Sequence, residues 1–338
     1  MKKSTVFLAL LIVCGSAWAY NPPVGGEDIF YFSDPELLSG AGSATGGPLA
    51  SVVPASITFN PALTALSQRT AVNASYTIAI DSASNSNAGH FIQLGTILPN
   101  RWCIVAATAQ ATFAEMNRMN LGNNIIIHAG VAKDITKKLL VGANIYTGLY
   151  FGDDSDFTVG ADIGMIYQFD DFAFLRKPRL GISFLNLGKP FSNVDATYPN
   201  IVTPRLSLSA GLFEVRGFSG AVSVDLRAPF FQNIIVDTAI GFAYKSIVGL
   251  TFNWSFNAQE TARGVPISMP AIGVHIRFAI NSNKFSSKNE DWEQSELGPS
   301  LAWQNRYDGI QIISTGMHMD LGLADTTAPE IILWNGEE

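Results

Sequence analysis

The sequence predicts an all-β protein, a 14-stranded antiparallel transmembrane β-barrel. Three observations lead to this prediction: an N-terminal export signal, long segments in which apolar and polar residues alternate, and a charged content of only 14% among 338 residues. Average soluble domains contain about 25% charged residues. Because successive side chains of a strand point to opposite faces, alternation gives each strand one apolar and one polar face. A membrane-spanning barrel turns its apolar faces outward to the lipid.

The composition excludes several other classes of protein. Hydrophobic residues make up 47% of the chain and phenylalanine occurs 22 times, whereas disordered chains are rich in charge and poor in aromatic residues. The net charge of −7 and the lack of a basic stripe argue against nucleic acid as a partner. Beyond the first 20 residues there is no apolar run as long as a membrane-spanning helix needs, about 18 residues.

Residues 1–19 have the three parts of a secretory signal peptide. Lys2 and Lys3 form the positive region, residues 6–14 form a short apolar region, and residues 17–19 form an A-x-A cleavage site. This predicts export through the Sec pathway. Cys14 leaves lipoprotein processing open as an alternative, although Val13 is a poor fit for the position before a modified cysteine.

Cleavage after Ala19 leaves Cys103 as the single cysteine of the mature chain. One cysteine cannot form an internal disulfide. Because Cys103 lies in an apolar run, we expect it to be a packed or membrane-facing thiol and not a nucleophile.

Residues 20–68 precede the alternating region and do not share its pattern. Residues 39–47 form a loop of small residues, but they lack the third glycine of GxGxxG and the lysine of a phosphate-binding loop. We therefore expect tight packing in a narrow space and no nucleotide. Asn60 followed by Pro61 predicts a capped short helix, whose apolar face begins with Leu63 and Leu66.

Alternation begins near residue 69 and is clearest in residues 248–257, where apolar residues at even positions alternate with small or polar ones at odd positions. The clean segments run about ten residues, which suits a tilted membrane-crossing strand better than a soluble one. The pattern predicts strands at 69–81, 88–98, 101–112, 122–133, 138–152, 155–169, 178–187, 203–214, 217–228, 231–244, 246–257 and 269–281, with two weaker strands at 299–306 and 309–322.

Charged residues within these segments orient the strands, because Arg or Lys on the lipid face costs roughly 2–4 kcal/mol at the midplane. We expect His275 to line the lumen beside Arg277. The charged side chains predicted to point into the lumen are Asp81, Asp162, Arg205, Asp225, Arg227, Asp237 and Arg277.

The connections should alternate between short periplasmic turns and longer outer loops. Residues 99–100 and 245–246 fit tight turns, and residues 82–88, 188–202 and 258–268 fit outer loops. The long polar segment 282–298 falls on the periplasmic side and fits poorly there. The expected organisation is a barrel over 69–323 followed by a periplasmic tail over 324–338.

The residues give little sign of an enzyme. The four histidines show no metal-ligand spacing, and neither HExxH nor GxSxG occurs. We expect no catalytic residues, no bound metal and no cofactor. A lipid-modifying barrel enzyme, with its site formed only in the fold, stays open as an alternative.

The order of these features resembles the long-chain fatty-acid transporter (FadL-type) superfamily of outer-membrane barrels. A glycine- and alanine-rich segment leads into Asn60, Pro61 and Ala62, and a long barrel follows. Residues 160–167, 180–188 and 203–211 look more like the PorV-type branch and a related uncharacterised bacterial family. The tail from Asp325 to Ile331 departs from the expected barrel terminus with a final aromatic residue.

The resemblance implies that residues 20–68 form a hatch inside the lumen, with Asn60, Pro61 and Ala62 as its motif. It implies passive uptake of hydrophobic compounds, long-chain fatty acids above all, across the outer membrane of a diderm bacterium. The expected partners are outer-membrane lipids, the hydrophobic ligand and the barrel-assembly machinery. The candidate lumen contacts for the ligand are Arg205, Arg227, Arg277, His275 and Asp162.

Two other functions stay open at this point. A scaffold or protein-binding barrel of the PorV type would keep its lumen closed, and the tail could then bind a partner. A general porin would conduct small solutes, although fourteen strands enclose less room than the 16–18 strands of open porins.

Overall fold

The computed structural model describes residues 22–82, 88–151, 155–193, 196–198, 202–280 and 295–321. The predicted signal peptide, the alternative lipid site at Cys14 and the predicted tail over 324–338 lie outside these residues. Within the described part of the chain, no helix is long and apolar enough to cross a membrane.

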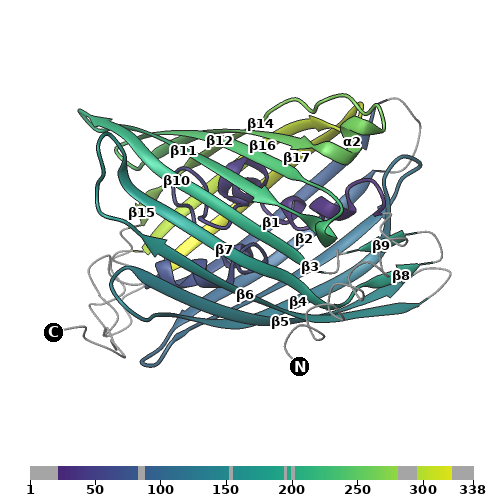
Figure 1. Ribbon diagram of the computed structural model, residues 1–338, viewed down its shortest axis with the longest axis horizontal. Helices are drawn as coiled ribbons and strands as arrows, with labels where there is room; N and C mark the ends of the chain where they lie inside the picture. The colour runs from purple at the N-terminus through teal and green to yellow at the C-terminus, as the bar shows by residue number, and fades with distance from the viewer. Residues whose placement is uncertain are drawn as a thin grey trace, which may run out of the picture.

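Fifteen of the described strands close into one antiparallel barrel (Figure 1). Each strand pairs with its neighbours in sequence, and β1 pairs with β17 to close the circle. The strands are β1 (Thr70–Asp81), β2 (Gly89–Pro99), β3 (Ile104–Glu115), β4 (Asn120–Asp134), β5 (Leu139–Phe151), β6 (Asp156–Gln168), β7 (Arg176–Lys189), β10 (Thr203–Val215), β11 (Phe218–Arg227), β12 (Ile235–Tyr244), β13 (Val248–Asn257), β14 (Ala271–Ile276), β15 (Phe278–Ile280), β16 (Ser295–Arg306) and β17 (Ile310–Leu321).

Strands β14 and β15 follow one another and both pair with β16, with an interruption at Arg277. They therefore count as one barrel strand, and the prediction of fourteen antiparallel strands is confirmed. The two weaker strands of the sequence prediction are β16 and β17, which form one of the longest ladders of the barrel.

Some predicted boundaries were wrong for identifiable physical reasons. Strand β3 begins at Ile104 and not at 101, because the Asn100 side chain accepts hydrogen bonds from the backbone of Trp102 and Cys103 and holds them in a turn. Cys103 is therefore a half-buried turn residue and not a strand residue. Strand β12 begins at Ile235 and not at 231, because the helix η6 (Pro229–Phe231) comes first.

Three connections between strands also differ from the sequence prediction. The connection predicted over 282–298 ends too late, because β16 already begins at Ser295. The outer loop 188–202 contains a small hairpin of β8 (Phe191–Asn193) and β9 (Ala196–Tyr198) that forms a separate two-stranded sheet. The loop 258–268 begins with the short helix α2 (Ala258–Ala262), capped by Asn257.

The barrel is polar inside and apolar outside, as a membrane barrel requires. In β13 the small and polar residues at odd positions 249–257 are buried, whereas Val248, Trp254 and Phe256 are exposed. Six of the seven charged residues expected in the lumen are at most 5% exposed, and Arg277 is half-buried. A soluble sandwich would bury its apolar faces instead.

Residues 22–68, called the inner segment below, lie inside the barrel (Figure 1). They form five short helices: η1 (Gly26–Asp28), η2 (Tyr31–Ser33), η3 (Leu37–Ala41), η4 (Pro54–Thr58) and η5 (Pro61–Leu66). Most of their side chains are buried, including Phe32, Leu37 and Phe59. The inner segment provides part of the apolar core and joins none of the described strand ladders.

Candidate functional site: the inner segment and its lumen contacts

The Asn60-Pro61-Ala62 motif connects the inner segment to itself and to the wall. Asn60 caps η5, since its Oδ1 accepts a hydrogen bond from the backbone N–H of Ala62 at 3.0 Å. Its Nδ2 donates to the carbonyl oxygens of Ala44 at 2.7 Å and of Met165, in β6, at 3.1 Å. One buried amide thus serves the helix, the small-residue loop and the barrel wall.

The motif fits against a notch of three glycines on adjacent strands, Gly142, Gly164 and Gly181, which we call the glycine notch. A Cβ on Gly142 would lie 2.5 Å from the Ala62 nitrogen, and a Cβ on Gly164 would overlap the Asn60 side chain. At Gly181 a Cβ would overlap the carbonyl of Ala44. Only glycine lets the backbone of the inner segment approach the wall so closely at these points.

Arg205, in β10, joins the small-residue loop to the wall. Its guanidinium binds Asp225 at 2.6 Å and donates to the Tyr31 hydroxyl at 2.8 Å and to the Gly42 carbonyl at 3.0 Å. The backbone N–H of Ala44 donates to the same Asp225 at 3.0 Å. The carboxylate of β11 therefore holds an arginine of the wall and the backbone of the inner segment together.

A second set of ion pairs surrounds Asp28 of η1. Its carboxylate binds Arg227 at 2.6 Å and Arg306 at 2.7 Å, and it accepts a hydrogen bond from Tyr307 at 2.6 Å. Arg227 also binds Asp237 at 3.0 Å. We call these residues, together with Arg205 and Asp225, the arginine network.

Electrostatics keeps Asp28 ionised despite complete burial. Burial alone would raise the pKa of its carboxyl group, but the charges of Arg306 and Arg227 outweigh this effect and lower the pKa to about 2. The arginine network contains three arginines and three aspartates, so their formal charges balance. Removing one member would leave a buried charge unpaired, which typically costs about 3–5 kcal/mol.

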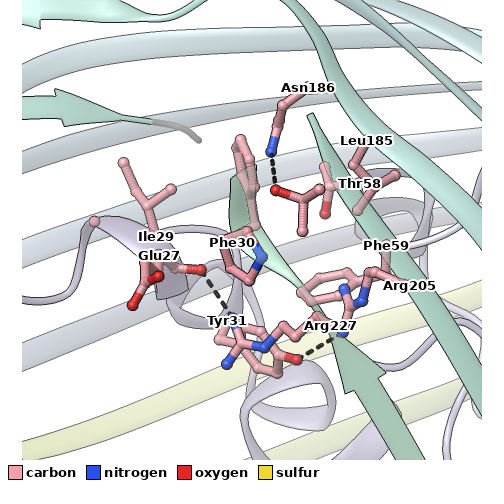
Figure 2. A pocket seen from close by; sticks show the side chains of 13 residues that line it. Glu27, Ile29, Phe30, Tyr31, Thr58, Phe59, Leu185, Asn186, Arg205 and Arg227 are labelled. Atoms are coloured by element: carbon pink, nitrogen blue, oxygen red, sulfur yellow. Dashed lines mark hydrogen bonds between the residues drawn. The ribbon is translucent and has the colours of Figure 1, made fainter. Parts of the chain in front are cut away.

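A small cavity borders the arginine network (Figure 2). It lies between Tyr31 and Phe59 of the inner segment and the wall residues Leu185, Asn186 and Arg205. Its volume of about 30 Å³ is enough for one or two water molecules. Sites for small molecules usually measure about 300–1,000 Å³, so this cavity is closed to a hydrophobic ligand in the present conformation.

The hairpin of β8 and β9 covers an aromatic cluster near η1. Phe191 and Tyr198 are buried, with ring centroids 5.7 Å apart, and Phe191 also packs on Tyr150 at 5.8 Å. The hydroxyl of Tyr198 donates to the carbonyl of Leu121. Phe32 and Phe91 extend this apolar region further into the barrel.

The structure places the predicted contact residues in different surroundings. Arg205 and Arg227 belong to the arginine network. His275 is 9% exposed and borders a second small cavity beside Glu36, whereas Arg277 interrupts the strand between β14 and β15 and is half-buried. Asp162 accepts a hydrogen bond at 2.6 Å from the backbone N–H of Asn186 and stabilises a bulge between β6 and β7.

The sequence analysis missed several members of this site. Arg306 could have been found, because it is a charged residue in a predicted strand and the lipid-face rule applies to it. Asp28 and Tyr31 precede the alternating region and show no comparable signal. Three or more metal-ligating residues do not come together anywhere in the described part of the chain.

Neither a protein-family model nor a curated protein matches this chain. Solved structures are similar in fold. The toluene transporter TbuX of Ralstonia pickettii aligns with a TM-score of 0.53 and 10% identity, over 86% of this chain and 98% of its own. The monoaromatic hydrocarbon channel CymD aligns with a TM-score of 0.50 and 13% identity, over 87% of this chain and 98% of its own.

A mutant of the monoaromatic hydrocarbon channel TodX is similar to the same degree, with a TM-score of 0.53, 10% identity and coverage of 87% of this chain and 99% of its own. At these identities the likeness concerns the fold: this chain has the fold of hydrocarbon-transporting outer-membrane barrels. The PorV-type branch stays a prediction.

Proposed function

We propose that this chain is an outer-membrane barrel that lets hydrophobic compounds cross passively, and that it is not an enzyme. The observation that carries the proposal is a lipid-compatible barrel whose lumen is filled by a separate inner segment. Side-chain contacts and close packing hold that segment, and it takes part in none of the described wall ladders. It can therefore shift while the strand pairing of the wall stays intact.

The ion pairs of the arginine network limit which class of compound can bind in the lumen. Arg205 and Arg227 already bind carboxylates of the chain at 2.6 Å, so a fatty-acid carboxylate would have to displace one of them. The aromatic cluster under β8 and β9 is formed by aromatic rings, and the Tyr198 hydroxyl within it already donates to the carbonyl of Leu121. We therefore favour uncharged apolar compounds as the substrate class, with long-chain fatty acids as the second class, and the solved structures with this fold are named for toluene and monoaromatic hydrocarbons.

The proposal also includes the predicted surroundings of the chain. Residues 1–19 would direct export through the Sec pathway, and the barrel-assembly machinery would insert the chain into the outer membrane. Within the membrane, Asn60, Pro61 and Ala62 would hold the inner segment in its closed position as a hatch.

Uptake by cells that lack their own transporters tests this function. Cells expressing this chain should take up labelled toluene faster than cells without it, and labelled oleate more slowly than toluene. An N60A variant, which loosens the inner segment, should change the rate of uptake. Uptake equal to that of cells without the chain, with the protein shown folded in the outer membrane, would contradict the proposal.

A scaffold that binds another protein is the second candidate function. The observation that favours it is the fixed inner segment: buried ion pairs hold it in the lumen, and the cavity beside the arginine network holds only about 30 Å³. A folded barrel without uptake of either compound would support this function. A general porin is disfavoured by the same observation, and we expect no conductance for small ions.

A further inference from the structure

The two ends of the barrel carry their positive charges differently. Short turns join five pairs of strands at one end of the barrel, and this is also the end at which β1 begins and β17 ends. The five pairs are β2–β3, β4–β5, β6–β7, β10–β11 and β12–β13. We call it the short-turn rim. The opposite end carries α2 and the hairpin of β8 and β9 (Figure 1). In bacterial barrels short turns face the periplasm.

Every one of these five connections places an exposed cation at the short-turn rim. None of the five forms an ion pair with a described residue, whereas Arg69, Lys138 and Arg176 at the same rim are paired. The five exposed cations are Arg101, Lys137, Lys177, Arg216 and Lys245.

The opposite rim differs among its described residues. Arg118 is paired with Asp81 and Asp308, and Lys189 is paired with Asp156. Arg263 is the one exposed cation there for which the described residues provide no ion pair. At the short-turn rim these five cations face one exposed carboxylate without an ion pair to a described residue, that of Asp171, which accepts a hydrogen bond from the Lys177 backbone. Among the described residues the excess of exposed positive charge therefore lies at this end of the barrel.

Exposed apolar side chains accompany four of the five cations. The Arg101 guanidinium lies 5.1 Å from the centre of the Trp102 ring, which is 67% exposed, and the Lys245 ammonium lies 5.4 Å from that of Tyr244. Arg216 lies between the exposed Val215 and Phe218, and Lys177 follows two exposed phenylalanines of its turn. An apolar stem or ring beside a charged tip is typical of side chains at the border between lipid and water.

We propose that the short-turn rim binds the head groups of anionic phospholipids, those with a net negative charge, in the adjoining leaflet. The five cations are spread over ten consecutive barrel strands, from β2 to β13. A protein partner would need them gathered on one side, whereas lipids surround the barrel. Lys and Arg near a membrane surface are attracted to anionic lipids, and the lipid phosphates supply the counter-charge that the described residues do not.

Lipid retention by the purified full chain tests the inference. The protein in dodecyl maltoside is equilibrated with equal amounts of phosphatidylglycerol and phosphatidylcholine, and the lipids that stay bound are counted by native mass spectrometry. We expect at least threefold more phosphatidylglycerol than phosphatidylcholine on the unaltered chain. A tenfold molar excess of inorganic phosphate should leave this ratio unchanged, because the lipid is also held by its apolar chains.

Two double variants distinguish the effect of the five exposed cations from the effect of net charge alone. R101Q/K245Q removes two of the five cations, and K138Q/R176Q removes two paired cations of the same rim, so both lower the net charge equally. We expect the first to reduce the excess of phosphatidylglycerol by about two-fifths and the second to leave it unchanged. A variant with all five cations replaced by glutamine should bind both lipids equally. If this variant does not fold, as judged by resistance to proteolysis, the comparison of the two double variants tests the inference by itself.

Three results would overturn the inference: equal binding of the two lipids by the unaltered chain, an equal loss in both double variants, or displacement of the lipid by inorganic phosphate. The first would leave the rim as a surface for an acidic protein. The second would show an effect of net charge alone. None of these outcomes depends on which compound crosses the barrel.

Discussion

At the scale of single residues, the inner segment is held by a few buried polar side chains. Asn60 makes three hydrogen bonds to three different parts of the chain, and Asp28 meets two arginines and a tyrosine of the wall. Such contacts are directional, and an unsatisfied buried partner costs about 1–3 kcal/mol. The position of the inner segment is therefore specified by particular atoms as well as by apolar packing.

Replacing Asn60 by alanine should lower the free energy of unfolding by roughly 2–3 kcal/mol, the sum of a lost helix cap and unsatisfied buried carbonyls. Urea unfolding in neutral detergent measures this change. Asn123 is half-buried and donates to Glu115 in an exposed hydrogen bond, so it provides the matched control. N123A should change the stability by less than about 0.5 kcal/mol, and equal effects of the two variants would contradict the anchoring role of Asn60.

Asp34 should make the stability depend on pH. Burial and the nearby charge of Glu36 raise its pKa to about 7, although hydrogen bonds from Asn73 and from the Glu36 backbone and the charge of His318 oppose the rise. An unfolded aspartate releases its proton near pH 4. Between about pH 4 and pH 7 the folded state therefore binds more protons, and stability falls as the pH rises.

A D34N variant removes this titration and tests its origin. In the unaltered chain Asn73 Nδ2 donates to Asp34 at 3.0 Å. When the Asn73 amide turns over, the new amide can donate to Asn73 Oδ1, a buried atom that has no hydrogen-bond partner in the described structure. The difference in urea midpoint between pH 4 and pH 7 should be smaller in D34N than in the unaltered chain. The same pH dependence in both proteins would show that other groups, such as Glu36 or His318, cause it.

At the scale of elements, the wall is shaped to accept the inner segment. The glycine notch lies on β5, β6 and β7, and Gly142 and Gly164 are direct cross-strand partners. These strands therefore lack side chains where η5 and the small-residue loop come closest. The sequence predicts both the strands and the small-residue loop but not that they meet, because the contact joins residues about 80 to 140 positions apart.

A methyl group at Gly164 should disturb this contact. G164A would place a Cβ into the Asn60 side chain, and such overpacking typically costs about 1–3 kcal/mol. Gly298 in β16 is the control, because a Cβ there meets no atom closer than 3.5 Å. G298A should keep the stability within about 0.5 kcal/mol. Thermal unfolding followed by the shift in gel mobility compares the two variants, and an equal response would argue against the glycine notch.

At the scale of the whole molecule, the outer architecture was more predictable than the interior. Period-two alternation and the cost of charge in lipid act on each strand separately, so they predicted fourteen strands and the inward side of Asp225 and Arg227. The ion pair of Asp225 with Arg205, and those of Arg227 with Asp237 and Asp28, depend on how strands and inner segment come together in space. Alternation along single strands does not predict such contacts. It also did not predict the hairpin of β8 and β9 within the loop 188–202, because strands of three residues are too short to show alternation.

The central claim is that the inner segment must move for a hydrophobic compound to pass. Thr45 of the inner segment and Ser207 of β10 have hydroxyl oxygens 3.0 Å apart, so a T45C/S207C pair can join them by a disulfide. Thr77 and Ser314, 2.6 Å apart on β1 and β17, give a control disulfide within the wall. Both pairs would be made with Cys103 replaced by serine.

Uptake of labelled toluene by cells expressing these variants, before and after reduction, is the most direct measurement. Oxidised T45C/S207C should take up little toluene and recover on reduction, because its disulfide holds the inner segment to the wall. The T77C/S314C control should take up toluene at the same rate in both states. Undiminished uptake by fully oxidised T45C/S207C would contradict the claim that the inner segment controls passage through the barrel.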